Sequence, residues 1–296
     1  MTRGLLQLVL ALLVLAKPAA AAIARDTGAS TFPVTQAIFD TAGTSRNLTA
    51  FSTSAATTTL IVYFAWRGNA NVALPYTVTW VGGTPSGATA WTRAIEQGIT
   101  GTGANVIGCA VWTASATSAL TSVQVNVAKS GADESSNEAT FAQDALTGAG
   151  TSITNTGQVH SNNGSAVNRA VTLAGVASGS WLYVSYSGDD SGANLTAQTN
   201  TTTNIENRQM AAGGQAASGA NITGTSGSIT VGWTGTQAFS ATCAAEVPVA
   251  GGAAADIQTM RGFWGAMPKW QILRRKPLIM DLFERRRQAQ RIRWFV

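Results

Sequence analysis

Between residues 26 and 252, short runs rich in β-branched and aromatic residues alternate with clusters of Gly, Asn, Ser, Thr and Asp. The runs are Thr58–Trp66, Tyr76–Val81, Ala90–Glu96, Asn105–Thr113, Ser122–Lys129, Asn168–Ala174, Ser180–Ser187, Ser228–Trp233 and Phe239–Val249. Many short strands separated by turn-forming residues are typical of β-sandwiches and barrels. No stretch of this region has the 3.6-residue apolar period of a helix. We therefore predict an all-β domain with antiparallel strands over residues 25–252.

The side-chain pattern within the runs predicts two packed sheets. In Ser122–Lys129, the residues Val123, Val125 and Val127 fall on one side of a strand, because successive side chains point to opposite faces. Small polar residues then cover the outer faces without adding charge. The segment 200–227 has few large apolar residues and is expected to form either a long loop or a weak edge hairpin.

The order of the runs also resembles a known group of domains. The residues that carry the resemblance are Leu60–Phe64, Val78–Gly83, Ala90–Ala94, Ala110–Ala114, Val123–Val127, Ser180–Val184 and Ala244–Pro248. Over roughly residues 50–249 the chain is similar to jelly-roll, concanavalin-like or lectin-like β-sandwich domains of exported bacterial proteins and phage structural proteins. The resemblance implies an antiparallel jelly-roll-like β-sandwich, and it brings no catalytic residue with it.

The amino-terminal residues 1–24 have the three-part layout of an export signal. Arg3 provides a positive start, an apolar run follows over residues 5–16, and small residues offer cleavage sites at Ala20-Ala21-Ala22 or Ala22-Ile23-Ala24. The run is shorter than the roughly 20 residues that a membrane-spanning helix needs. We expect an apolar helix that acts as an export signal, with an uncleaved anchor as the alternative, and hence a secreted, cell-surface or virion location.

The carboxyl-terminal residues 253–296 differ sharply from the domain before them. From residue 256 onward, ten basic residues stand against three acidic ones, a balance of +7, whereas residues 26–255 carry six basic and eleven acidic residues, a balance of −5. Pro277 can begin a helix, and apolar residues then recur near helical spacing. We predict a basic amphipathic helical tail. Its expected anchoring residues are Trp270, Arg274, Arg275, Lys276, Arg285, Arg286, Arg287, Arg291, Arg293 and Trp294.

Such a tail fits an acidic protein surface, an anionic membrane or a polyanion. We expect protein as its partner, in an assembly or in neighbouring subunits. An anionic membrane surface and a glycan bound by the domain remain as alternatives, and nucleic acid is disfavoured because the basic charge is confined to the tail.

The chain offers little catalytic chemistry. It has one histidine, His160, in a loop-like segment, and no G-x-S-x-G nucleophile elbow. The acids Asp133, Glu134 and Glu138, and the pair Asp189 and Asp190, are interpreted as turn residues. A glycanase needs two acids across a cleft. Asp189 and Asp190 are weak candidates for calcium ligands, and no other cofactor is expected.

Tryptophan and cysteine leave two further questions open. Nine tryptophans suit the core of a sandwich, but Trp66 and Trp91 are candidate sugar-stacking residues. Cys109 and Cys243 both lie in strand-like runs, where buried free thiols are favoured over a disulfide.

These observations predict a non-enzymatic structural or adhesive protein of a virion or bacterial exterior. In this hypothesis a basic tail anchors the β-sandwich to an assembly or surface. The alternative is a carbohydrate-binding domain or weak glycanase with a lectin-like fold.

Overall fold

The computed structural model describes residues 21–27, 30–39, 44–54, 58–68, 76–100, 106–129, 138–153, 155–188, 195–209 and 215–250. The chain divides into two units at residues 250 and 251, and all the described residues belong to the first. Within them every regular element is a β-strand and every strand pairing is antiparallel, which confirms the all-β prediction. The expected amino-terminal and tail helices lie outside the described residues.

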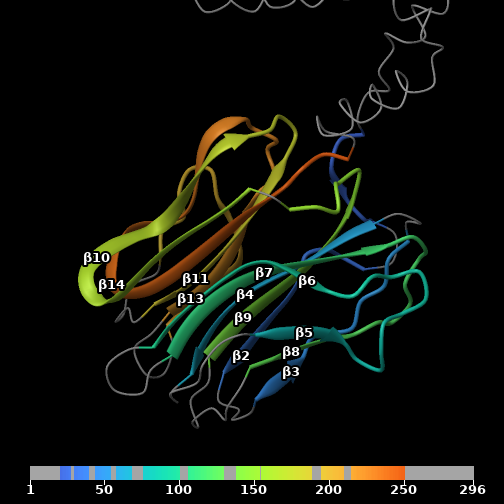
Figure 1. The fold of residues 1–296 in the computed structure, drawn as a ribbon, viewed down its shortest axis with the longest axis horizontal. Helices are drawn as coiled ribbons and strands as arrows, with labels where there is room; N and C mark the ends of the chain where they lie inside the picture. Colours follow the sequence, from blue (N-terminus) through green and yellow to red (C-terminus); the bar gives the residue numbers. More distant parts are fainter. Residues whose placement is uncertain are drawn as a thin grey trace, which may run out of the picture. The chain divides into compact units, whose positions relative to one another are not determined.

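The strands form three sheets (Figure 1). The central sheet has the order β1 (Ala24–Arg25), β9 (Glu138–Thr147), β4 (Thr58–Gly68), β7 (Val106–Ala116) and β6 (Thr92–Thr100), and β2 (Val34–Phe39) also pairs with β9. The long-strand sheet has the order β10 (Thr156–Val176), β14 (Gly227–Val247), β11 (Trp181–Gly188), β13 (Gln215–Asn221) and β12 (Thr202–Gln209). The small sheet consists of β3 (Ser45–Asn47), β8 (Val125–Ala128) and β5 (Thr77–Trp80).

Both faces of the central sheet are buried, so the domain has three layers where the sequence pattern predicts two. Along β4, Leu60, Val62, Phe64 and Trp66 pack in the cluster that also contains the apolar side chains of the small sheet. The intervening residues, among them Tyr63, pack against the long-strand sheet. A strand buried on both faces is apolar at successive positions, which accounts for the unbroken run in β4. The central and long-strand sheets form the sandwich-like pair.

The long-strand sheet also bends over itself. The runs Ser228–Trp233 and Phe239–Val249, expected as two strands, form most of β14. Within β14 the residues Gly232 and Gly235 have φ angles of +126° and +88°, and the pairing with β10 changes register nearby. The bend packs Trp233 against Tyr186 of β11, with ring centroids 5.9 Å apart. The long-strand sheet thereby encloses a hydrophobic cluster of its own.

Two other predicted segments have clear outcomes. Residues 200–227 contain β12 and β13, which pair with each other, and β12 lies at the edge of the sheet, so the hairpin alternative is confirmed. His160 lies in β10 opposite Ala241 with an exposed side chain; it is in a strand and not in the loop that its sequence context suggests.

Candidate functional site

Trp66 and Trp91, the candidate sugar-stacking residues, both lie in the core. Their side chains are 1% and 8% exposed. The Trp66 ring stacks on Tyr76 with centroids 5.9 Å apart, and the Trp91 ring packs on Trp80 at 5.0 Å. A sugar needs an exposed aromatic face to stack on. The structure therefore assigns these two rings to packing between the central and small sheets.

Two basic residues lie over the ring of Trp66. The guanidinium of Arg46 on β3 is 5.6 Å from the ring centroid, and Nζ of Lys129, which follows β8, is 5.2 Å from it. Both side chains are buried. Cations near an aromatic face are attracted to it. These contacts join β3 and the residue directly after β8 to β4 in the central sheet.

The position of Lys129 has a consequence for pH dependence. Burial, together with the positive charge of Arg46, lowers the pKa of Lys129 to about 8. The unfolded chain holds this proton up to an ordinary lysine pKa near 10.4. Because the unfolded state binds more protons between these values, we expect the free energy of unfolding to rise as the pH increases from 8 toward 10. Urea unfolding at pH 7, 8, 9 and 9.5 measures this rise, which the variant K129M should lack. Parallel pH profiles for K129M and the wild type would contradict the assignment.

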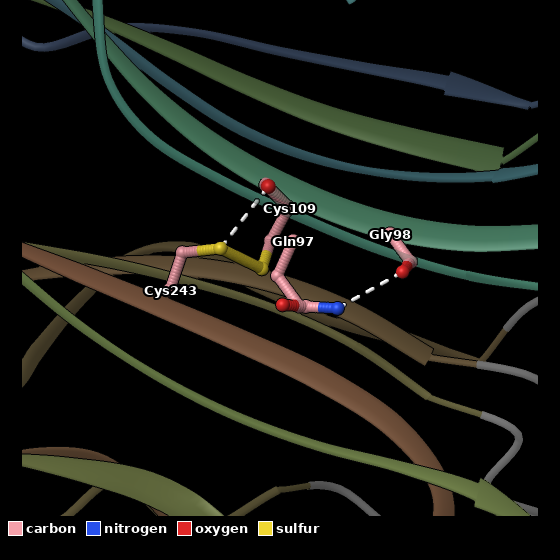
Figure 2. Close-up of a disulfide and its surroundings, with 4 residues drawn as sticks. All are labelled: Gln97, Gly98, Cys109 and Cys243. Carbon is pink, nitrogen blue, oxygen red and sulfur yellow. Dashed lines mark hydrogen bonds between the residues drawn. A yellow bond between two sulfur atoms is a disulfide. The ribbon is translucent and has the colours of Figure 1, made fainter. Parts of the chain in front are cut away.

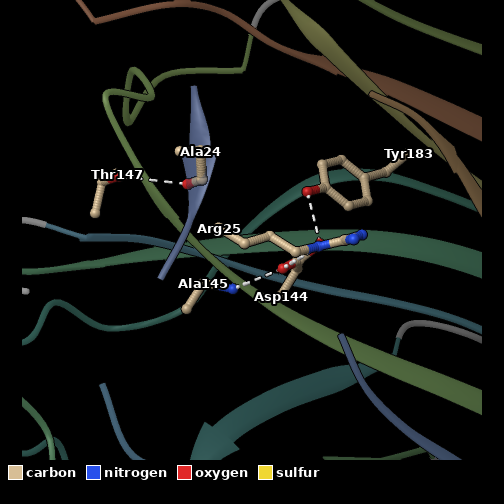
Figure 3. A network of polar contacts seen from close by, with 6 residues as sticks. All are labelled: Ala24, Arg25, Asp144, Ala145, Thr147 and Tyr183. Atoms are coloured by element: carbon tan, nitrogen blue, oxygen red, sulfur yellow. Dashed lines mark hydrogen bonds and ion pairs between the residues drawn. The ribbon is translucent and has the colours of Figure 1, made fainter. Parts of the chain in front are cut away.

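A buried ionic network joins the central and long-strand sheets (Figure 3). Asp144 of β9 accepts hydrogen bonds from Nε of Arg25 at 3.0 and 3.2 Å and from the Tyr183 hydroxyl at 3.1 Å. The backbone N–H of Ala145 donates to the same carboxylate at 3.1 Å. The Arg25 guanidinium also lies 5.7 Å from the ring centroid of Trp181. The network therefore connects β1 and β9 to β11.

Desolvation has the largest influence on the pKa of Asp144, the acid at the centre of this network. The side chain of Asp144 has no exposed surface. Burial raises the pKa of its carboxyl group, and the Arg25 charge and the hydrogen bonds from Tyr183 and Ala145 oppose that rise. A buried carboxylate needs such compensation because isolated charge is very unfavourable in the interior. The cluster therefore serves to hold the layers together.

Cys109 and Cys243 form a disulfide between β7 and β14, so the favoured interpretation as free thiols was wrong (Figure 2). Both residues are fully buried, and Sγ of Cys243 lies 3.1 Å from the carbonyl oxygen of Cys109. Gln97 of β6, which pairs with Cys109, lies beside the bond. The sequence could not show this pairing because it depends on two strands from different sheets facing each other.

The disulfide belongs to a band of small side chains between the two sheets. Neighbouring positions across the strands are occupied by Cys109, Ala65 and Thr140 in the central sheet and by Cys243, Ser185 and Ser218 in the long-strand sheet. At the other end of the band from the disulfide, the hydroxyls of Thr140 and Ser218 are 3.2 Å apart and hydrogen bonded. Both ends of the band thus cross-link the same two sheets.

A second buried acid, Glu246 of β14, fixes loops next to the long-strand sheet. Its carboxylate accepts a hydrogen bond of 2.6 Å from Nδ2 of Asn155 and one of 2.9 Å from the backbone N–H of Ala177. Sequence reasoning did not single out Arg25, Asp144 or Glu246. A signal was present, since a lone charge within an apolar or alanine-rich strand predicts a buried partner.

Several predicted site residues lie outside the described part of the chain. They are Asp133, Glu134, Asp189, Asp190 and all ten anchoring residues of the tail. Glu138 lies in β9, opposite Phe39 and Arg67 in the strand pairing.

Among the residues that the structure describes, no group of three or more His, Cys, Asp or Glu side chains is arranged to hold a metal ion. None of the described elements is a helix with the length and hydropathy to cross a bilayer.

Most of the charged side chains whose burial the structure describes are at least partly buried. Among the charged side chains whose burial the structure describes, all except Arg93 are buried or half-buried: Arg25, Asp26, Arg46, Glu96, Lys129, Asp144, Arg169 and Glu246. The groups that they contact through hydrogen bonds, ion pairs and cation–π interactions belong to the same domain. These contacts therefore stabilise one packing of the three sheets.

The chain was compared with protein-family models, curated proteins and solved structures, and it matches none of them.

Proposed function

We propose that this chain is a structural or adhesive module of a virion or of the bacterial exterior, without a catalytic role of its own. In this proposal the sandwich is a jelly-roll-like, lectin-like domain that is exported and then held in an assembly by the basic tail. Neighbouring subunits of the assembly are the partners of that tail.

The observation that carries the proposal is the internal use of charge described above. Asp144 and Glu246 cross-link strands and loops, and the Cys109–Cys243 bond joins two layers. This arrangement favours a rigid scaffold, because the buried polar side chains form hydrogen bonds and ion pairs with groups of the same domain. A disulfide between the only two cysteines also favours an oxidising compartment, since thiols stay reduced in the cytosol.

Charge complementarity supports a protein partner for the tail. Residues 256–296 carry +7 and residues 26–255 carry −5. The tail of one subunit can therefore be attracted to the domain of another. Such attraction between exposed charges is screened within about 10 Å at 0.1 M salt, so it should weaken as salt increases.

Removing the tail tests this function. We expect the full chain to self-associate at low ionic strength and to dissociate as salt is added, whereas a chain ending at residue 255 stays monomeric and unfolds at the same urea concentration. Sedimentation velocity at about 0.05 and 0.5 M salt measures the association, a range over which the screening length falls severalfold. The triple variant R285Q/R286Q/R287Q should weaken association, and its matched control R285K/R286K/R287K should retain it. Equal association of the truncated and full chains would contradict the proposal.

A further inference from the structure

Residues 248–250, which we call the tail root, connect β14 to the segment that carries the basic tail. Strand β14 ends at Val247, which is fully buried, and the first unit of the chain ends at Ala250. The tail is joined covalently to its own domain through this connection. Tension on a tail that is bound to a neighbouring subunit therefore enters the domain at the tail root and passes into β14.

The tail root is fastened to the residues that follow β9. Two backbone hydrogen bonds of 2.7 and 2.8 Å and one isolated β-bridge join residues 248–250 to residues 148–150. The buried hydroxyl of Thr59, on β4, donates to the Ala149 carbonyl at 3.1 Å. A hydrogen bond of this kind contributes about 1 kcal/mol, so the tail root alone resists only a weak pull.

Strand β14 is next in line and is held on both sides. Over residues 240–245 it pairs with β10 and β11 at once. The carboxylate of Glu246 also accepts hydrogen bonds from Asn155 and Ala177. Hydrogen bonds of an antiparallel ladder run perpendicular to the strands. A strand that is pulled at its end can therefore lose them one after another as it peels away.

A covalent bond interrupts such peeling four residues before the end of β14. Cys243 is joined there to Cys109 of β7, which lies between β4 and β6 in the central sheet (Figure 2). Both cysteines are fully buried. Tension that strips residues 244–247 from the long-strand sheet therefore reaches β7 through the disulfide, and an inner strand of the central sheet takes the load.

We propose that the Cys109–Cys243 bond has a mechanical function: it transfers tension from the tail to the central sheet, so that a loaded subunit keeps its fold. This inference rests on the proposed anchoring by the tail and adds the route by which the domain carries the load. The amino-terminal end of the domain has a different route. Ala24 and Arg25 pair with β9 of the central sheet, so a pull from that end reaches this sheet without crossing the disulfide.

Pulling the oxidised full chain in two directions with optical tweezers tests this route. In both directions one handle is coupled to a peptide tag inserted between Ser118 and Ala119, two exposed residues shortly after β7. Exposed loops of this kind tolerate insertions. The other handle is coupled either to Val296 or to the first residue of the chain. The lifetime of the fold at constant force is measured for the wild type and for C109A/C243A.

Under tension on the tail, a continuous covalent path through Cys243 and Cys109 carries the load in the wild type, and C109A/C243A lacks this path. We expect the ratio of wild-type to variant lifetime to be at least about tenfold larger under tension on the tail than under tension on the amino-terminal end. Because C109A/C243A is weakly stable, all proteins are measured in the same sucrose buffer, which favours the folded state. The matched control E246Q loses contacts near the tail root but keeps the bond, and its ratio should not depend on the direction of pulling.

The outcomes separate this inference from the function on which it rests. Equal ratios in the two directions for C109A/C243A, or a dependence on direction in E246Q instead, would overturn the load route and leave the binding of the tail to neighbouring subunits standing. A direction-dependent ratio for C109A/C243A, in a chain whose tail does not mediate association at low salt, would overturn the proposed anchoring. The load route would then stand as a property of the fold.

Discussion

Replacing Cys109 and Cys243 with alanine should lower the free energy of unfolding by about 5 kcal/mol. The bond joins residues that are 134 positions apart, and the entropy of closing a loop of that length in the unfolded chain corresponds to about 5 kcal/mol. A single domain is typically stable by about 5–15 kcal/mol in total. The double variant C109A/C243A should therefore be marginally folded. Urea unfolding followed by tryptophan fluorescence measures the change.

The single variants provide the control. Because either substitution breaks the bond completely, C109A and C243A should each lose about as much stability as the double variant, since the two sites act as one unit. Wild-type protein unfolded with a reductant should reproduce the same loss. Additive effects of the two single changes, or a double variant within about 1 kcal/mol of the wild type, would show that the bond contributes little in solution.

The disulfide also illustrates what the sequence could and could not predict. Both cysteines lie in runs that are correctly predicted as strands. Whether two such strands face each other depends on sheet order, which is decided by contacts between residues far apart in the chain. The local sequence pattern carries no information on sheet order. It could therefore not decide whether Cys109 and Cys243 form a disulfide or remain free thiols.

Strands rich in β-branched and aromatic residues could be predicted from the sequence, whereas a strand rich in alanine and polar residues could not. Strand β4 is rich in β-branched and aromatic residues and was predicted at nearly its full length. Strand β9 lies beside β4 in the same sheet and was missed, because its sequence EATFAQDALT contains mainly alanine and polar residues. Such residues have low β-propensity, yet here they form a strand because small side chains fit between closely packed layers. Tertiary packing overrides local preference at β9.

The small sheet, which forms the third layer, could not be predicted from the alternation of apolar and polar residues alone. Val123–Val127 alternates as expected for a strand with one buried face, and β8 lies in the outer small sheet. The uninterrupted apolar run in β4 is the pattern of a strand with two buried faces, and it was the available signal for a central sheet covered on both sides.

The second large effect is expected at the Arg25–Asp144 pair. Substituting Arg25 with methionine should lower the free energy of unfolding by about 3–5 kcal/mol at pH 7, because it leaves the fully buried Asp144 carboxylate without its cation. Asp144→Asn should also destabilise the fold, but by less, since the side chain of Arg25 is 24% exposed and can turn toward water. Urea unfolding of both variants and of the double variant R25M/D144N measures these losses.

The pH dependence of the two variants distinguishes a lost charge partner from lost packing. Burial already raises the pKa of Asp144, and removal of the Arg25 charge should raise it further. The folded R25M variant then binds a proton more tightly than its unfolded chain does, so its free energy of unfolding should increase as the pH falls from 7 toward 5. R25M/D144N has no carboxylate at this position and should lack that increase. It should also lose less than the sum of the two single variants, because neither charge remains buried alone. If R25M loses the same stability at pH 5 and pH 7, Arg25 acts through packing on Trp181 and not through its charge.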